Sequence, residues 1–221
     1  MNYEWRLTML PKIEVGLRVA GLTVKRFLDW VEDSLKLKEE DKAAIYRAVG
    51  KKCSDKGKVD SAINSLSKAV ELNSEYAESH YKLGLAHAKK GNHEDATHAF
   101  NKVIELSKNN GHAKEIDISD VYYRLGLCYG KQDKVDNGIE MLIEALKITD
   151  DNAKTHFQLG LLYDKARKHG ESIKAYKTAI ELDPQREKYY YSLGLAYEAN
   201  GEHDKSIEAF RMAMETEEPE E

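Results

Sequence analysis

Proline and cysteine are scarce in this chain of 221 residues, which contains 3 and 2 of them respectively. So little proline excludes a collagen-like chain, and two cysteines are too few for the disulfide framework of a small secreted domain. The sequence also lacks any run of 18 apolar residues, so it holds no candidate for a membrane-spanning helix. With 33% charged and 41% apolar residues, the composition is typical of a water-soluble, helical protein.

An excess of positive charge is absent as well. The formal net charge is -5, and the last seven residues, ETEEPEE, carry five glutamates and no base. The rest of the chain is therefore neutral, which gives no general attraction to nucleic acid phosphates. At the other end, MNYEWRLTMLPKIEVGLRV places charges where a signal peptide needs an apolar stretch, so we expect a cytoplasmic protein.

A repeat with a period of 34 residues dominates the sequence. Within residues 43–220, glycine follows Val or Leu five times, and successive occurrences are 34, 42, 34 and 34 residues apart. The longer spacing contains an eight-residue insert, GHAKEIDI, at 111–118. The glycines are Gly50, Gly84, Gly126, Gly160 and Gly194.

Other positions of the unit repeat too. With this glycine as position 8, position 20 is small, position 24 is large and position 27 is small or compact. The pattern suits two closely crossing helices, which a Cβ at position 8 would push apart. Period and pattern resemble the tetratricopeptide repeat (TPR), a helix-turn-helix unit. The resemblance implies an all-α fold, a right-handed superhelix (solenoid) whose repeats bury their apolar faces by stacking.

This frame divides the chain into segments. Repeats one and two occupy 43–110, the insert at 111–118 is a hinge or a longer surface loop, and repeats three to five occupy 119–220 with the acidic tail. Residues 1–42 are either a degenerate repeat or an amphipathic helical segment, because apolar side chains recur there at helical spacing. These candidate self-assembly residues are Val24, Phe27, Leu28, Val31 and Leu35.

The first helix of each repeat is expected to line a concave groove. If positions 4, 7, 8 and 11 form the core, positions 5, 9 and 13 face the groove as an aromatic row, a leucine row and a mostly lysine row. Such rows indicate an interface for another protein's helix or peptide, with lysines that favour acidic flanks. The candidate groove residues are Arg47, Lys51, Tyr81, Leu85, Lys89, Tyr123, Leu127, Lys131, Phe157, Leu161, Lys165, Tyr191 and Leu195.

Other interpretations stay open. The rows could instead pack against each other between neighbouring repeats. The carboxylate clamp of some TPR co-chaperones, Lys at position 5 with Asn at position 9, does not occur. Without an HExxH motif, a P-loop or a CxxC pair, we expect no catalytic residue, metal site or cofactor. His93, His169 and His203 share position 17 and are expected to pack or cap, and Cys53 and Cys128 to be small core residues.

In repeat layout and in its leading segment LRVAGLTVKRFLDW, the chain also resembles the magnetosome-associated TPR family MamA. That resemblance implies a cytoplasmic scaffold that coats the magnetosome membrane peripherally. It implies a homo-oligomer formed when the N-terminal degenerate repeat of one copy docks into the groove of another, while other magnetosome proteins bind elsewhere, including the convex face. The alternatives are a monomeric peptide-binding adaptor or co-chaperone unrelated to magnetosomes, and an enzyme with an unrecognised site.

Overall fold

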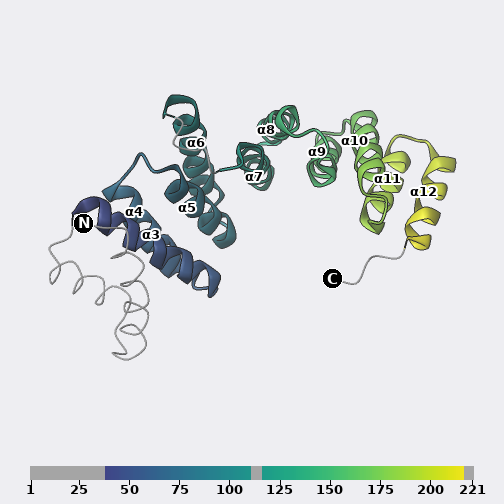
Figure 1. Cartoon of the computed structure of the whole chain (residues 1–221). Helices are drawn as coiled ribbons and strands as arrows, with labels where there is room; N and C mark the ends of the chain where they lie inside the picture. Colours follow the sequence, from purple (N-terminus) through teal and green to yellow (C-terminus); the bar gives the residue numbers. More distant parts are fainter. Residues whose placement is uncertain (1–37, 111–115, 217–221) are drawn as a thin grey trace.

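In the computed structural model of the protein, residues 38–110 and 116–216 are described, and they form ten α-helices and no β-strand (Figure 1). The helices follow one another in pairs, one pair to a repeat. They are α3 (Glu39–Asp55), α4 (Val59–Leu72), α5 (Ala77–Lys90), α6 (His93–Asn110), α7 (Ile118–Lys131), α8 (Val135–Ile148), α9 (Ala153–Lys165), α10 (His169–Leu182), α11 (Glu187–Ala199) and α12 (His203–Glu215).

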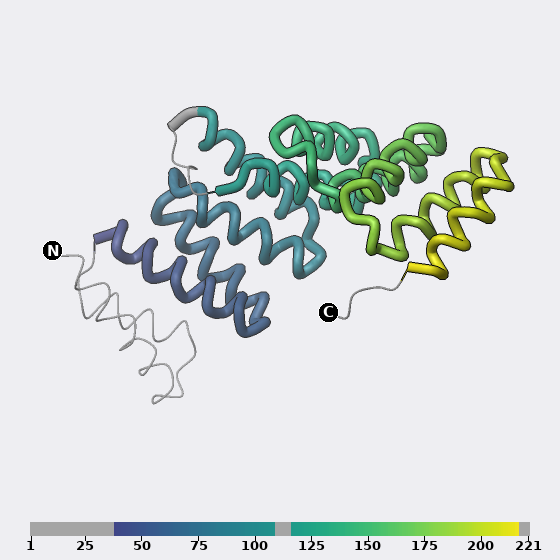
Figure 2. The backbone as a smooth tube through the Cα atoms, turned by 45° about the vertical axis from the view of Figure 1, so that its right-hand side comes forward, coloured from purple at the N-terminus to yellow at the C-terminus, as the bar shows by residue number. Residues whose placement is uncertain are grey.

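The pairs stack in chain order into the predicted right-handed solenoid. Each helix packs against the next one along the chain, within a repeat and between repeats. The first helices of neighbouring repeats also contact one another, α3 with α5, α7 with α9, and α9 with α11. Figure 1 shows these first helices along the inside of an arch, and Figure 2 shows the same succession of pairs from another side. Their inner side is called the concave face below.

Glycine at position 8 allows the two helices of a repeat to cross closely. A Cβ on Gly160 would lie 2.5 Å from Cε1 of Tyr176, and one on Gly126 would lie 2.7 Å from Leu142. The large side chain at position 24 therefore fills the space that position 8 leaves, which confirms the predicted close crossing. The equivalent pairs are Gly50 with Leu66, Gly84 with Phe100, and Gly194 with Phe210.

The turn inside each repeat needs a left-handed residue at position 15. Gly57, Gly91 and Gly201 supply it in repeats one, two and five, with φ between 71° and 88°. Repeats three and four use Asp133 (φ 64°) and Arg167 (φ 58°) instead. A side chain is strained in this conformation, so the turn geometry is imposed by the packing of the helices on either side.

The core differs from the expected one at positions 4 and 11 of the repeat. Position 3 is buried in every repeat, as Val121 and Tyr189 show, whereas position 4 is only partly buried in repeats three to five. The expectation that position 4 fills the core throughout was wrong, because positions 3, 7 and 10 share the helix face that packs on the preceding repeat. Position 11 is likewise mixed, since Cys53 and Tyr197 are buried there but Tyr129 and Tyr163 only partly.

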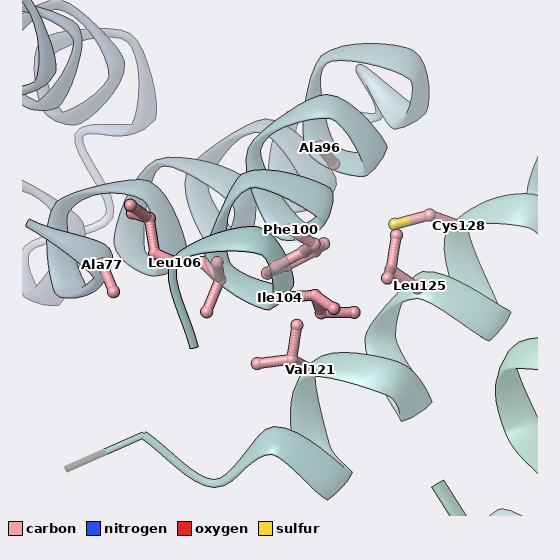
Figure 3. Packing of buried hydrophobic residues seen from close by; sticks show 9 residues of the cluster. Ala77, Ala96, Phe100, Ile104, Leu106, Val121, Leu125 and Cys128 are labelled. Atoms are coloured by element: carbon pink, nitrogen blue, oxygen red, sulfur yellow. The ribbon is translucent and has the colours of Figure 1, made fainter. Parts of the chain in front are cut away.

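The junction between repeats two and three shows this packing. Val121, Leu125 and Cys128 of α7 join Phe100 and Ile104 of α6 in one buried cluster (Figure 3). Cys128, like Cys53, is a free, buried thiol, as predicted. Burial raises the pKa of the Cys128 thiol to about 11, which keeps it protonated and unreactive at neutral pH.

The insert lies at the same junction. The second helix of repeat two, α6, continues to Asn110, and α7 begins at Ile118. The hydroxyl of Tyr81 donates to Oδ2 of Asp120 at 2.5 Å, and Nε2 of Gln132 donates to the carbonyl oxygen of His93 at 3.0 Å. Hydrogen bonds and a shared cluster thus connect the two repeats. Most of the predicted insert and the predicted self-assembly segment lie outside the described residues.

Candidate functional site

The predicted aromatic residues at position 5 lie on the concave face, where Tyr81, Tyr123 and Phe157 are half-buried and Tyr191 is exposed. Three of these rings contact the ring at position 24 of the same repeat, with centroids 6.1 Å apart for Tyr81, 5.7 Å for Phe157 and 5.5 Å for Tyr191. Phe157 also lies 4.7 Å from the ring of Tyr189 in the next repeat. Tyr123 packs beside the cluster of α8 and α9, and burial raises its pKa. These rings pack mainly on the second helix of their own repeat, and Phe157 also packs on the next repeat.

Ion pairs occupy the concave side of repeats one to three. Glu78 at position 2 pairs with Lys82 at 2.8 Å and with Arg47 at 3.7 Å. Burial acts to raise the pKa of Glu78, but Lys82 and Arg47 outweigh it and lower that pKa. In the next repeat Asp120 accepts from Nε of Arg124 at 2.6 Å. The predicted groove residue Arg47 also stacks over the ring of a neighbouring tyrosine, 3.7 Å from its centroid.

The leucine row becomes more exposed toward the C-terminal repeats. Leu85 and Leu127 are half-buried, whereas Leu161 exposes 39% and Leu195 48% of its surface. Tyr191, one helical turn before Leu195 in repeat five, is 52% exposed. Lys51 holds the same position in repeat one and is exposed. The exposed apolar residues of these rows therefore belong to repeats four and five, and the half-buried Leu127 of repeat three lies next to them in the row.

A shallow pocket of about 300 Å³ lies between α7 and α9. It brings together four predicted residues, Leu127 and Lys131 with Leu161 and Lys165. The other residues that line the pocket were not identified from the sequence, although Gly130, the second glycine of GLCYG in α7, was a usable signal. A Cβ on Gly130 would lie 2.9 Å from Cδ2 of Leu162, so a side chain here would displace Leu162, which lines the pocket. The missed residues are Gly126, Gly130, Gln158 and Leu162.

Lysines border the exposed leucines at both ends of the helices. Position 2 is acidic in repeats two and three but is Lys154 in α9 and Lys188 in α11, and positions 2, 5 and 9 share a helix face. These two lysines and Lys131 are exposed and make no ion pair within the residues that the structure describes. Lys165 pairs with Asp133 at 2.7 Å.

We call this surface the lysine-bordered strip. Its apolar residues are Leu127, Leu161, Tyr191 and Leu195, and its borders are Lys131, Lys154, Lys165 and Lys188. The remaining predicted lysine, Lys89 of α5, is exposed on repeat two, outside the strip. Such a surface can bind an apolar segment with acidic flanks, because apolar contact supplies affinity and the lysines attract carboxylates.

The position-17 histidines begin the second helices. Nδ1 of His203 lies 2.9 Å from Glu198, which raises the pKa of His203, and Nδ1 of His169 lies 3.4 Å from Asp164. Asp164 also accepts from the hydroxyl of the buried Tyr176 at 2.7 Å. Within 38–110 and 116–216, no three His, Cys, Asp or Glu side chains are placed to hold a metal ion together. None of the helices in these ranges has the length and hydropathy to cross a membrane.

Comparison with known proteins agrees with this architecture. A model described as TPR repeat matches residues 50–91 and 168–201. Of two models described as tetratricopeptide repeat, one matches residues 77–110 and the other matches 119–152 and 187–218. Among curated proteins, the sequence finds no significant match.

Several solved structures are similar. A crystal structure of MamA protein is 29% identical, with a TM-score of 0.72, over 79% of this chain and 91% of that one. MamA 41-end from Desulfovibrio magneticus RS-1 is 27% identical, also at 0.72, over 80% and 95%. YrrB, described as a TPR protein with an unusual peptide-binding site, shares the fold at 21% identity and a TM-score of 0.70, over 86% and 91%. Together with the matched repeats and the helix pairs described above, these likenesses show that the chain belongs to the tetratricopeptide repeat family.

Proposed function

We propose that the lysine-bordered strip binds an apolar, acid-flanked helix or peptide, so that the protein acts as a non-enzymatic scaffold for protein–protein interaction. The observation that carries this proposal is the exposure of Leu161, Tyr191 and Leu195 on one face of adjacent helices. Exposed apolar residues that gather in a row mark interaction sites more often than residues that are scattered singly. Covering these three side chains contributes about 1 kcal/mol each, since each is already partly buried.

The strip differs from the rest of the concave face because most of its lysines have no acidic partner in the described chain. In repeats one to three, Glu78 and Asp120 neutralise nearby bases. In repeats four and five, lysines replace these acids and stay without acidic partners in the described chain. A ligand with carboxylates on both sides of its apolar face fits the strip better than the N-terminal half of the groove, and the lysines mainly accelerate the encounter.

The ligand that we propose is the N-terminal segment of a second copy. In sequence, its apolar residues Val24, Phe27, Leu28, Val31 and Leu35 are interspersed with Asp29, Glu32 and Asp33. Contact between two different surfaces is heterologous and gives rings or open assemblies. With the likeness to MamA, this supports a homo-oligomeric scaffold, located in the cytoplasm, that coats the magnetosome membrane and recruits magnetosome proteins.

The second candidate function is a monomeric peptide-binding adaptor. It is favoured by the likeness to YrrB and by the pocket between α7 and α9, which could hold one apolar side chain of a peptide. Removal of residues 1–42 separates the two candidates. A self-assembling scaffold loses its large species in size-exclusion chromatography with light scattering, whereas an adaptor elutes as a monomer with or without the segment.

The strip itself is tested by the double variant Leu127→Glu with Leu161→Glu. We expect it to lose binding of a synthetic peptide spanning residues 22–36 by at least tenfold, while circular dichroism stays helical. The matched control is Ile143→Glu with Ile148→Glu, which changes two exposed isoleucines of α8. Unfolding of the strip variant would show that its leucines are core residues, and binding as tight as in the unmodified protein would refute the proposal.

The magnetosome assignment needs a cellular test. In a magnetite-forming cell that expresses the tagged protein, we expect the protein to sediment with the magnetic membrane fraction and to be released by high salt. A protein that stays in the supernatant before any salt is added would contradict the assignment without affecting the peptide-binding test.

A further inference from the structure

The helix α12 exposes a face whose equivalent in α10 is covered by the first helix of the next repeat. Positions 21 and 28 of the repeat are Ile173 and Ile180 in α10, and both pack in the cluster that contains Leu193 of α11. The same positions in α12 are Ile207 and Met214, which are 69% and 80% exposed. The face is therefore shaped, at these two positions, like the ones that receive a first helix elsewhere in the solenoid.

Internal junctions show what kind of helix fits. In α7, Val121, Leu125 and Cys128 pack on Ile104 of α6, and these three residues occupy positions 3, 7 and 10. The covering helices thus present apolar or small residues at i, i+4 and i+7, which lie on one helical face.

The charges around the exposed face of α12 indicate what kind of partner can bind it. Asp204, Glu208 and Glu215 are exposed on α12, and Arg211 is already paired with Glu208 at 2.5 Å and with Glu215 at 2.8 Å. We call Ile207, Met214 and these charged residues the end face. Its acidic surplus disfavours contact between two end faces and favours a basic partner.

We infer that the end face binds residues 12–26 of a second copy, KIEVGLRVAGLTVKR. This stretch belongs to the segment that precedes α3 in sequence, and Ile13, Leu17 and Ala20 have the spacing i, i+4 and i+7 that the covering helices use. It also carries four bases and one acid. The bases are Lys12, Arg18, Lys25 and Arg26.

The contact extends the solenoid from one copy to the next. It joins two different surfaces, so it propagates head to tail, and no two-fold symmetry closes it. It goes beyond the proposed function because the end face lies on α12 and not on the first helices that form the lysine-bordered strip. Either surface can therefore fail while the other binds.

The test uses the full chain and two labelled synthetic peptides, residues 10–27 and residues 22–36. In Ile207→Glu with Met214→Glu, we expect affinity for the 10–27 peptide to fall at least tenfold and affinity for the 22–36 peptide to stay unchanged. The controls are Ile143→Glu with Ile148→Glu, which should bind both peptides, and Leu127→Glu with Leu161→Glu, which should keep the 10–27 peptide. Equal binding of the 10–27 peptide by the end-face variant, or no binding by the unmodified protein, overturns the inference.

A charge exchange adds a second readout. Replacing Glu208 and Glu215 by lysine should weaken binding of the 10–27 peptide, and a peptide with Lys25→Glu and Arg26→Glu should restore it. Sedimentation velocity of the full-length end-face variant should show a lower average mass than the unmodified protein at equal concentration. Failure of the exchanged peptide to recover affinity would contradict the proposed pairing of charges.

Discussion

At the scale of single residues, the repeat depends on side chains that are missing as much as on those present. Gly160 and Gly126 lie where the two helices of a repeat cross, under the side chain of position 24. Gly170, near the start of α10, has no atom within 4 Å of its would-be Cβ. Glycine thus has different roles in one chain: in the crossings it creates space, and at Gly170 it only weakens the helix.

We predict that Gly160→Ala destabilises the protein by about 1–3 kcal/mol, because overpacking against the Tyr176 ring outweighs the gain in helix propensity. Gly170→Ala, the matched control, should stabilise it by about 0.5–1 kcal/mol. Urea unfolding followed by circular dichroism measures both. A neutral Gly160→Ala would mean that the Tyr176 ring moves aside freely.

Buried histidine at position 4 predicts a dependence on pH. Burial lowers the pKa of His80, whose Nε2 lies 2.9 Å from the carbonyl oxygen of Ser74. The unfolded chain therefore binds the proton first, so the free energy of unfolding should decrease as the pH falls below about 6.5. His80→Gln should flatten this decrease, with a remainder from His87, whose pKa burial also lowers. Urea titrations between pH 7 and 5 measure the slope, and an unchanged slope would contradict the assignment.

At the scale of elements, the turn between paired helices is set by its surroundings. Asp133 and Arg167 adopt the left-handed conformation that glycine occupies in the other repeats. The repeat places a turn at position 15, and the sequence alone does not show that a side chain is held there with positive φ. Contacts of the flanking helices decide the conformation, and the residue follows at a cost.

We expect Arg167→Gly to stabilise the protein by roughly 0.5–1 kcal/mol, since the relief of left-handed strain exceeds the entropy that glycine adds to the unfolded chain. The reverse change, Gly201→Ala, should destabilise repeat five by about 1 kcal/mol. Thermal and urea unfolding measure both variants. A loss of stability in Arg167→Gly would indicate that the arginine side chain makes a stabilising contact.

At the scale of the whole molecule, each repeat contacts only its neighbours, so stability passes along the chain through the junctions. The junction between α6 and α7 is the one interrupted by the insert, and it depends on Val121 and its cluster together with two hydrogen bonds. Weakening it should separate the unfolding of the repeats on its two sides.

We predict that Val121→Ala costs about 2 kcal/mol and broadens the urea transition, with a lower apparent m-value, because the two sides no longer unfold together. Val49→Ala, a matched change within repeat one, should shift the transition without splitting it. Hydrogen exchange measured on α5 (77–90) and α9 (153–165) shows whether the two sides of the junction unfold together or separately. A sharp, single transition in Val121→Ala would show that the hydrogen bonds alone maintain the coupling.

The period of 34 determined the fold class, because recurring Gly, small and large residues at fixed offsets are compatible with few helical arrangements. It also identified Leu127, Leu161 and their lysines as candidates for the concave face. Only the tertiary structure decided that Tyr81, Tyr123 and Phe157 are half-buried while Tyr191 is exposed. It also decided that acids pair with the bases of the N-terminal half and that Ile207 and Met214 are exposed. These outcomes depend on which neighbour covers each side chain, and periodicity fixes the direction of a side chain within its helix but not its neighbour.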